Sequence, residues 1–357
     1  MTYPTVILTA FEVQAAYCDA NDAPITAAIC RAIAGALVEN EFAARTETGS
    51  AILNWAGNPV ADGLVLRLVG GLHALWLEGK EPRLDALFQG QSEPHEAAQE
   101  VATALCEYDA QLLRWLDSPP QTNEPGRSAA LMTGILHIAA RYPGKSIEIL
   151  EIGSSAGLNL LIDRFAFDLG GVKVGPADSP VLIQPDWRGL PPPEAPIDII
   201  SVRGCDIQPI DATEPDNEKR LLGYVWQDHP QRFERVAKAI AMQRAKPVNL
   251  VEADAADWVE ARLAEPQADG TLRILIHSIM WQYLTPEGQA RITAAMEAAG
   301  QQATKDRPLG WVSVEADRTF NRHDIVIRSW PDHREPSLIG HSHAHGFWVQ
   351  HLPGDLS

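Results

Sequence analysis

A change in hydrophobic pattern near Gly144 limits what this chain can fold into more than any other feature. Before Gly144, apolar residues recur every three or four positions, as they do along one face of a helix. After it, short apolar runs rich in β-branched residues alternate with helical patterns. Strands that alternate with helices form a mostly parallel sheet with right-handed crossovers. The sequence therefore predicts an α/β fold preceded by an all-helical region.

The predicted domain boundary lies close to this change. The chain has 357 residues, which is enough for one large domain or for two. We assign residues 1–120 to a helical N-terminal domain and residues 121–357 to an α/β domain. A Pro-rich stretch interrupts the alternation of strands and helices, and we interpret residues 170–196 as an insertion.

The spacing of apolar residues predicts three helices in the N-terminal domain. Pro24 suits the first turn of a helix, and large aliphatic residues follow at every fourth position over 25–37. A second helix is predicted over 64–76, and a single long helix over 98–116. In the α/β domain, cap and stop residues delimit a helix over 285–300.

Apolar runs in the α/β domain are typical of buried strands. A short helix is predicted over 158–165, directly after the first strand. The last two strands are joined without room for a helix, so we expect an antiparallel hairpin at one edge of the sheet. The predicted strands cover residues 146–153, 197–202, 248–253, 271–279, 310–316, 325–330 and 346–352.

The charge of the chain disfavours one class of partner. There are 29 Lys and Arg residues against 47 Asp and Glu residues, which gives a net charge of −18. A protein with such a field is not expected to bind the phosphates of nucleic acids over a broad surface. Small molecules are therefore the predicted ligands, and the sequence leaves the oligomeric state open.

Segments that would direct the chain to a membrane are not recognisable. The N-terminus has no basic region before its short apolar run, and no stretch approaches the roughly 20 apolar residues of a membrane helix. The four cysteines form no CxxC pair, so reduced thiols are expected. We predict a cytoplasmic protein without a membrane segment.

The most informative stretch begins at Glu151, where the first strand turns toward a helix. Small residues from Gly153 to Gly157 let a ligand approach the backbone there. The stretch lacks the Gly-Lys-Ser/Thr of a phosphate-binding P-loop, since Leu158 and Asn159 stand in that place. It also lacks two of the three glycines of a dinucleotide fingerprint.

The pattern acidic-x-Gly-x-x-x-Gly formed by Glu151, Gly153 and Gly157 resembles that of class I S-adenosylmethionine-dependent methyltransferases. A plain tight turn between strand and helix is the alternative. The resemblance implies a Rossmann-like sheet that binds S-adenosylmethionine. It also implies that Glu151 orients the turn or the cofactor amino group, while residues 153–157, with Ser154 and Ser155, give the cofactor backbone room.

Two later segments continue this resemblance in the expected order. Asp206, within Gly204–Pro209, is similar to the acidic residue with which these enzymes hold ribose, and one carboxylate can accept hydrogen bonds from both hydroxyls. Asp254, within 252–257, is similar to the residue that borders adenine. The alternatives are that Asp206 caps a turn and that Asp254 caps a helix.

Residues 121–128, together with 151–165 and 204–211, resemble a bacterial family of uncharacterised proteins that pairs a helical N-terminal region with a methyltransferase-like domain. In the first of these segments, Asn123, Glu124 and Arg127 could close over the cofactor or bind a substrate carboxylate. The alternative is a solvated linker with a helix cap and a structural salt bridge.

Histidines offer candidate bases. His277 lies near the end of its predicted strand, where α/β sheets bind ligands, although a buried structural histidine is an alternative. His345 is the second candidate. His341, His343 and His345 alternate, so on a strand they would share a face and could bind a metal, but they lack the accompanying ligands of known metal motifs and no metal is predicted.

These observations predict methyl transfer from S-adenosylmethionine to a small-molecule acceptor, with His277 or His345 as a base where the acceptor must lose a proton. The alternative is a methyltransferase fold without activity that binds a ligand or a partner. A nicotinamide oxidoreductase would share the sheet, but the missing glycines disfavour it.

Overall fold

The structure, a computed structural model, describes residues 5–317, 319, 320 and 322–353. The chain divides into two compact units, Met1–Thr122 with Glu214–Glu234, and Asn123–Thr213 with Arg235–Ser357. The boundary falls within α11 (Pro230–Ala245). Residues 214–234, predicted to belong to the α/β domain, thus pack with the helical unit.

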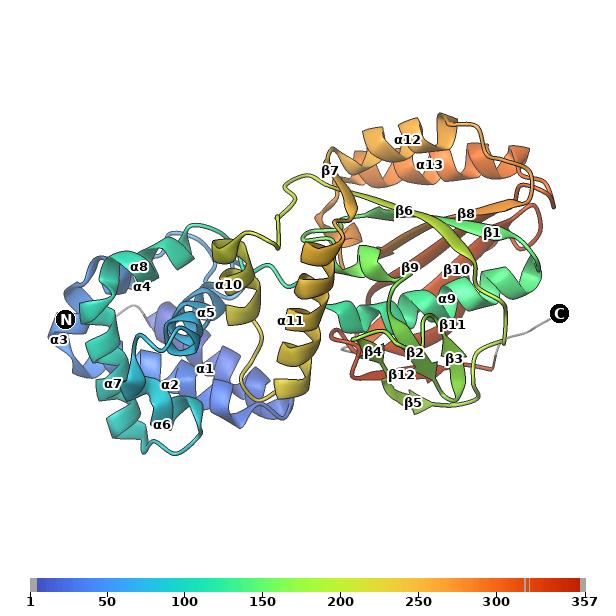
Figure 1. The fold of residues 1–357 in the computed structure, drawn as a ribbon. Helices are drawn as coiled ribbons and strands as arrows, with labels where there is room; N and C mark the ends of the chain where they lie inside the picture. The colour runs from blue at the N-terminus through green and yellow to red at the C-terminus, as the bar shows by residue number, and fades with distance from the viewer. Residues whose placement is uncertain (1–4, 318, 321, 354–357) are drawn as a thin grey trace. The chain divides into compact units, whose positions relative to one another are not determined.

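The first unit is helical wherever it has regular structure in the described residues (Figure 1). Its elements are α1 (Thr5–Ala20), α2 (Pro24–Glu39), α3 (Glu41–Arg45), α4 (Glu47–Leu53), α5 (Leu64–Leu77), η1 (Pro82–Leu84), α6 (Asp85–Phe88), α7 (Pro94–Glu107), α8 (Asp109–Leu113), η2 (Arg114–Leu116) and α10 (Pro215–Gly223).

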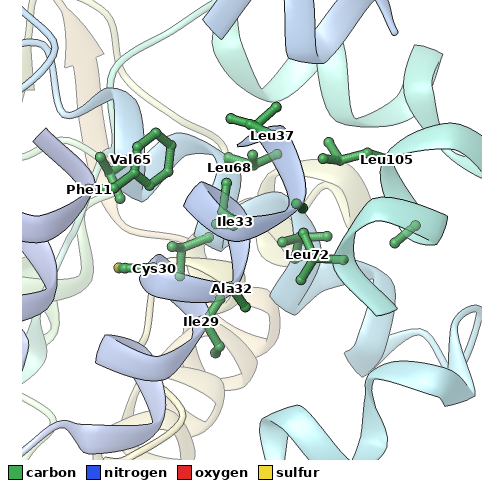
Figure 2. Packing of buried hydrophobic residues seen from close by; sticks show 14 of the residues in the cluster. Phe11, Ile29, Cys30, Ala32, Ile33, Leu37, Val65, Leu68, Leu72 and Leu105 are labelled. Carbon is green, nitrogen blue, oxygen red and sulfur yellow. The ribbon is translucent and has the colours of Figure 1, made fainter. Parts of the chain in front are cut away.

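One buried cluster holds this unit together. Figure 2 shows Ile29, Ile33 and Leu37 of α2 packed toward Leu68 and Leu72 of α5, so the predicted apolar stripe of α2 is confirmed. Such close packing of aliphatic side chains supplies most of the stability of a helical bundle.

The single long helix predicted over 98–116 is wrong, because the helix breaks at Tyr108. The carboxylate of Asp109 accepts hydrogen bonds from the backbone N–H groups of Glu47 (2.7 Å) and Thr48 (2.8 Å). Asp109 thereby satisfies the first turn of α4, whose N–H groups have no partner within their own helix. A tertiary contact therefore overrides the continuous apolar spacing.

The second unit is built on one large sheet. Among the described residues, nine strands form it in the order β5-β12-β11-β10-β9-β8-β1-β6-β7. The neighbours from β9 through β7 pair in parallel, whereas β9 to β12 pair antiparallel. The α/β class, the mostly parallel sheet and the helical N-terminal region are thus confirmed. The strands are β1 (Ser146–Ile152), β5 (Asp186–Arg188), β6 (Ile199–Asp206), β7 (Asn249–Glu252), β8 (Thr271–Ser278), β9 (Leu309–Asp317), β10 (Arg322–Trp330), β11 (Ser337–Ser342) and β12 (Trp348–His351).

The edge of this sheet differs from the prediction. The last two predicted strands are not neighbours, because β11 lies between β10 and β12. The segment of β11 is short and carries Gly340, so its sequence shows no strong strand pattern. β9 to β12 therefore form an antiparallel meander in place of a single hairpin.

The predicted insertion has its own structure. A small sheet, in the order β3-β2-β4, consists of β2 (Ala166–Leu169), β3 (Val172–Val174) and β4 (Leu182–Ile183), and β5 then joins the edge of the large sheet beside β12. The short helix predicted over 158–165 is only a 3₁₀ turn, η4 (Leu158–Leu161), since the chain enters β2 at Ala166.

Helices cover both faces of the large sheet (Figure 1). α12 (Ala255–Ala264) and α13 (Pro286–Gln302) lie on one face, and α9 (Ser128–Arg141) lies on the other. We call these the α13 face and the α9 face. No helix in the described part of the chain has the length and apolarity needed to cross a membrane.

The sheet creates one chemically favoured edge. The five parallel strands β1, β6, β7, β8 and β9 end at this edge, which we call the carboxyl edge, and the antiparallel β10 begins there. From β1 the strand order proceeds to β6 on one side and to β8 on the other. Open α/β sheets bind ligands at such a reversal point.

A buried histidine pair predicts how stability depends on pH. His137 Nε2 of α9 lies 2.8 Å from His351 Nε2 of β12, and burial, with the charge of His351, lowers the pKa of His137 to about 4. In the unfolded chain this group titrates near 6.5. Its contribution to stability is therefore present above about pH 6.5 and is lost as the pH falls toward about 4.

We expect His137→Gln, which retains a hydrogen-bonding side chain, to remove this pH dependence. Between about pH 8 and about pH 5, the free energy of unfolding of the wild type should fall by about 2 kcal/mol more than that of the variant. Urea denaturation at both pH values measures this, with the exposed His333→Gln as the control. Equal losses in wild type and His137→Gln would contradict the assignment.

Candidate functional site

The turn after β1 has a backbone that few residues adopt readily. Gly153, Ser155 and Gly157 have φ values of 68°, 53° and 73°. Positive φ is natural for glycine but uncommon for serine, and such strain concentrates at functional sites. Another glycine, Gly204 of β6, makes room for the turn, because a Cβ there would lie 2.3 Å from Ser154 Oγ.

Asp206 ties this turn to the end of β6. Its Oδ2 accepts a hydrogen bond from the backbone N–H of Ser155 (2.7 Å), and its Oδ1 accepts one from Gln208 (2.9 Å). Each carboxylate oxygen has two lone pairs, so both retain capacity for a ligand hydroxyl.

Asn123 fixes the turn from the other side. Its Nδ2 donates to the carbonyl of Ser154 (3.2 Å), and its Oδ1 accepts from the N–H of Leu158 (2.6 Å). The side chain is buried, and nearby Ser128 Oγ donates to Asn159 Oδ1 (2.9 Å). The amide thus binds the chain at two points of the turn, which holds the strained backbone in place.

Glu151 is the buried acid of this edge. The residue is 2% exposed, and its Oε2 has no hydrogen-bond partner among the described residues. The pKa of Glu151 is raised to about 7, chiefly by burial and also by the charge of Asp206, while a hydrogen bond with Ser154 and the charge of Arg127 oppose the rise. A buried carboxyl oxygen that lacks a partner destabilises the fold unless a ligand satisfies it.

The segment that contains Glu124 is packed against the turn between β11 and β12. Glu124 Oε1 accepts hydrogen bonds from Arg235 Nη2 (2.7 Å) and from the N–H of Gly126 (2.9 Å). Arg127 Nε donates to the carbonyl of Ala344 (2.9 Å). A Cβ at Gly126 would lie 2.6 Å from the carbonyl oxygen of His345, so the two segments touch along their backbones.

His277 belongs to a separate cluster. Its Nδ1 lies 2.7 Å from Glu315 Oε1, which also accepts from the N–H groups of Met280 and Trp281 (both 3.3 Å). The imidazole is stacked on Trp281, with ring centroids 5.1 Å apart. Nε2 is buried and has no partner among the described residues. Ile279, between these residues, has a φ of 53°, which is strained for a β-branched side chain.

The three alternating histidines do not share a strand face. His341 lies on β11 with its Nδ1 2.7 Å from Asp324 Oδ1, whereas His343 and His345 lie in the turn after it. There the N–H of His345 donates to His343 Nδ1 (3.0 Å). Across the described residues, no three His, Cys, Asp or Glu side chains form a group that could hold a metal ion.

A family model matches this fold over nearly its whole length. Residues 9–351 match the model described as "Uncharacterized protein conserved in bacteria (DUF2332)". The chain belongs to this family. No curated protein and no solved structure matches the chain.

In this DUF2332 protein, most residues of the predicted cofactor site lie together. Glu151, Asp206 and the turn 153–157 meet at the carboxyl edge, with Asn123 against the turn. Asp254 has a structural role, because its Oδ1 accepts from the N–H groups of the first turn of α12 and so caps that helix. The ligand-binding roles of these residues remain predictions.

Several polar residues near the candidate site were not found from the sequence. Glu315 lies in a segment for which the apolar pattern gave only a strand prediction, and His323 lies just before the strand predicted over 325–330. Ser342 lies on the strand that was missed. Arg235 stands in a helix with many charged neighbours, so nothing in the sequence marks it as the partner of Glu124. Only the long-range pairing of these residues reveals them.

The Asn123 contacts give a stability prediction. Asn123→Ala leaves the carbonyl of Ser154 and the N–H of Leu158 without their partner, so the free energy of unfolding should fall by about 2 to 4 kcal/mol. Asn249→Ala, at an exposed position of the same unit, should change it by less than about 0.5 kcal/mol. Denaturant unfolding measures the free energy of unfolding of both variants. Similar losses in the two would rule out this stabilising role of Asn123.

Proposed function

We propose that this protein transfers a methyl group from S-adenosylmethionine to a small-molecule acceptor. One observation carries the proposal. A buried carboxyl group, that of Glu151, has one oxygen, Oε2, without a partner among the described residues, and it lies beside a strained turn of small residues and beside Asp206, where the strand order reverses. A ligand with positive charge and hydroxyl groups is complementary to this arrangement.

The strand order supports the proposal at the level of the fold. Numbered along the chain, the five parallel strands β7-β6-β1-β8-β9 have the order 3-2-1-4-5, which is the order found around nucleotide sites of Rossmann-type sheets. Residues 151–157 and Gly204–Pro209 resemble methyltransferase motifs, and this resemblance is the reason for proposing S-adenosylmethionine as the ligand.

The residues at the edge fit the proposed cofactor. The Oε2 of Glu151 offers an acceptor to a cationic group, and the free lone pairs of Asp206 suit two ribose hydroxyls. Asp254 borders the same edge after β7, with its Oδ1 used in the helix cap. The sulfonium group would supply an activated methyl group.

The chain itself would contribute alignment and exclusion of water. Asn123 and Asp206 hold the turn rigidly, so a ligand bound there would meet a preorganised surface. The buried surroundings of Glu151 would strengthen its interaction with a cation. His277 and His345 remain the bases proposed from the sequence.

A catalytically inactive binding module is the second candidate. The observation that favours it is that several polar groups are occupied by the fold, since Asn123, Glu124 and Asp254 each bind backbone or side-chain partners. Binding of cofactor without transfer to a broad panel of metabolites would support the module and contradict the enzyme.

Calorimetric titration tests the cofactor. We expect S-adenosylmethionine and S-adenosylhomocysteine to bind, and NADH not to bind. Asp206→Ala should weaken both interactions at least roughly tenfold, because it removes charge-assisted hydrogen bonds to ribose. Asp168→Ala is the matched control, since that carboxylate also holds a turn, through the N–H of Gly171, but belongs to the small sheet. No binding by the folded wild type, or equal effects of both variants, would refute the proposal.

Glu151 gives a second, independent prediction. The carboxyl group is partly protonated near pH 7, and a bound cation would favour its ionised form, so binding should release a proton. Affinity for S-adenosylmethionine should therefore rise as the pH increases through about 7.

Titrations in buffers with different ionisation enthalpies measure this proton release. Glu151→Gln should abolish both the release and the pH dependence, while the exposed Glu287→Gln should leave both unchanged. Binding that is independent of pH in the wild type would show that Glu151 does not contact the cation.

A further inference from the structure

Two polar side chains on the α9 face lack partners although they are close neighbours. His323 at the start of β10 pairs directly with Ser342 at the end of β11. His323 Nδ1 and Ser342 Oγ are both buried, and neither has a hydrogen-bond partner among the described residues. Ser342 is 1% exposed. Directly opposed residues of neighbouring strands have side chains about 5 Å apart on one face, so these two atoms border the same space.

The register of the sheet places this pair on the same face as Glu151. Glu151 pairs with Ile276, Ile276 pairs with Val312, and residues paired in this way share a face. Ala316 lies on the face of Val312, since the two are separated by an even number of positions, and it pairs with His323. By the same register His277 lies on the opposite, α13 face.

The imidazole of His323 is held as a neutral acceptor. Nδ1 is buried and has no hydrogen-bond partner among the described residues. A neutral imidazole carries its lone pair on one of the two ring nitrogens, and we assign it to Nδ1, the nitrogen without a partner.

The charges around His323 favour the same state. Burial lowers the pKa of His323, and the charge of Arg127 lowers it further. The carboxylates of Glu315 and Asp324 and the backbone of Ser342 act in the opposite direction without cancelling the decrease. The ring is therefore neutral near pH 7.

These groups define the chemistry of a complementary ligand. A lone pair on Nδ1 must receive a proton from the ligand, which a carboxylate cannot supply. Arg127, whose positive charge acts on both His323 and Glu151, favours a ligand atom that becomes negative. Ser342 Oγ can donate to that atom as well. A weakly acidic hydroxyl, such as that of a phenol, meets all three conditions.

We propose that His323, with Ser342 beside it, binds the acidic hydroxyl of the methyl acceptor and is the base that removes its proton. The inference rests on the proposed methyl transfer. His323 Nδ1 takes the proton, the hydroxyl oxygen forms a bond to the methyl carbon, and the carbon–sulfur bond of the sulfonium donor breaks with its electron pair left on sulfur. The imidazolium then returns its proton to solvent. His323 would thus replace His277 and His345 as the catalytic histidine.

Binding of 4-nitrophenol, whose anion absorbs visible light, tests the site without an identified acceptor. The full-length protein should bind this probe saturably, and the bound probe should be less ionised than the free one at the same pH, because Nδ1 accepts a hydrogen bond only from the protonated hydroxyl. Benzoate should not compete at equal concentration, because it brings no proton for Nδ1.

Three variants complete this experiment. Ser342→Ala should weaken binding roughly three- to tenfold, as expected for one lost hydrogen bond, and His323→Gln should weaken it more and abolish the shift in ionisation. His341→Gln is the matched control, because His341 is also buried on β11 but faces away from Ser342 and binds Asp324. Thermal unfolding of each variant verifies that it is folded.

The outcomes separate this inference from the proposed function. Absence of saturable binding, equal effects of the three variants, or effective competition by benzoate would each overturn the hydroxyl site. If the probe binds as expected but S-adenosylmethionine does not bind, methyl transfer is refuted while the hydroxyl site stands. If S-adenosylmethionine binds and the probe does not, the proposed function stands without His323.

Discussion

The carboxyl edge depends on the side chain of Asn123, because it holds a turn that would not keep its shape alone. Residues of the turn have positive φ, including Ser155, and such a backbone persists only where its surroundings restrain it. The Asn123 amide satisfies the carbonyl of Ser154 and the N–H of Leu158 on one side, and Asp206 satisfies the N–H of Ser155 on the other. Glu151, which directly precedes this turn, is 2% exposed, so its carboxyl group has little contact with water.

Burial shifts the ionisable groups of the second unit in opposite senses. It raises the pKa of Glu151 and lowers the pKa values of His137 and His323, because in each case the neutral form is favoured. As the pH falls from about 7, protonation of Glu151 favours the folded state, whereas protonation of the histidines opposes it. These effects partly cancel in the stability of the whole unit, so the individual groups are distinguished only by comparing variants.

Local patterns in the sequence were sufficient for much of the α/β unit. β1 and β8 end within one residue of their predicted limits, because long apolar runs rich in β-branched residues strongly favour a buried strand over other structures. The break at Tyr108 was not predictable, since it depends on Asp109 reaching α4. The sequence also did not predict that residues 214–234 pack with the helical unit. The apolar face of a helix shows that the helix is packed against a core, but not which core. In the site, Glu151 and Asp206 belong to short motifs and were found from the sequence. His323 could not be found, because its role depends on its pairing with Ser342, which lies on a strand that was not predicted.

The two faces of the carboxyl edge use similar residues differently. On the α13 face, His277 binds Glu315, whose carboxylate also ties down the backbone after β8, and His341 binds Asp324. These imidazole–carboxylate pairs stabilise the packing of neighbouring strands and loops. This role is structural and needs no ligand. On the α9 face, the buried polar atoms of Glu151, His323 and Ser342 lack partners among the described residues. On the α13 face, His277 Nε2 and Trp311 Nε1 also lack partners among the described residues. The proposal of a ligand on the α9 face therefore rests on the register that places Glu151, His323 and Ser342 on one face, and not on the number of such groups.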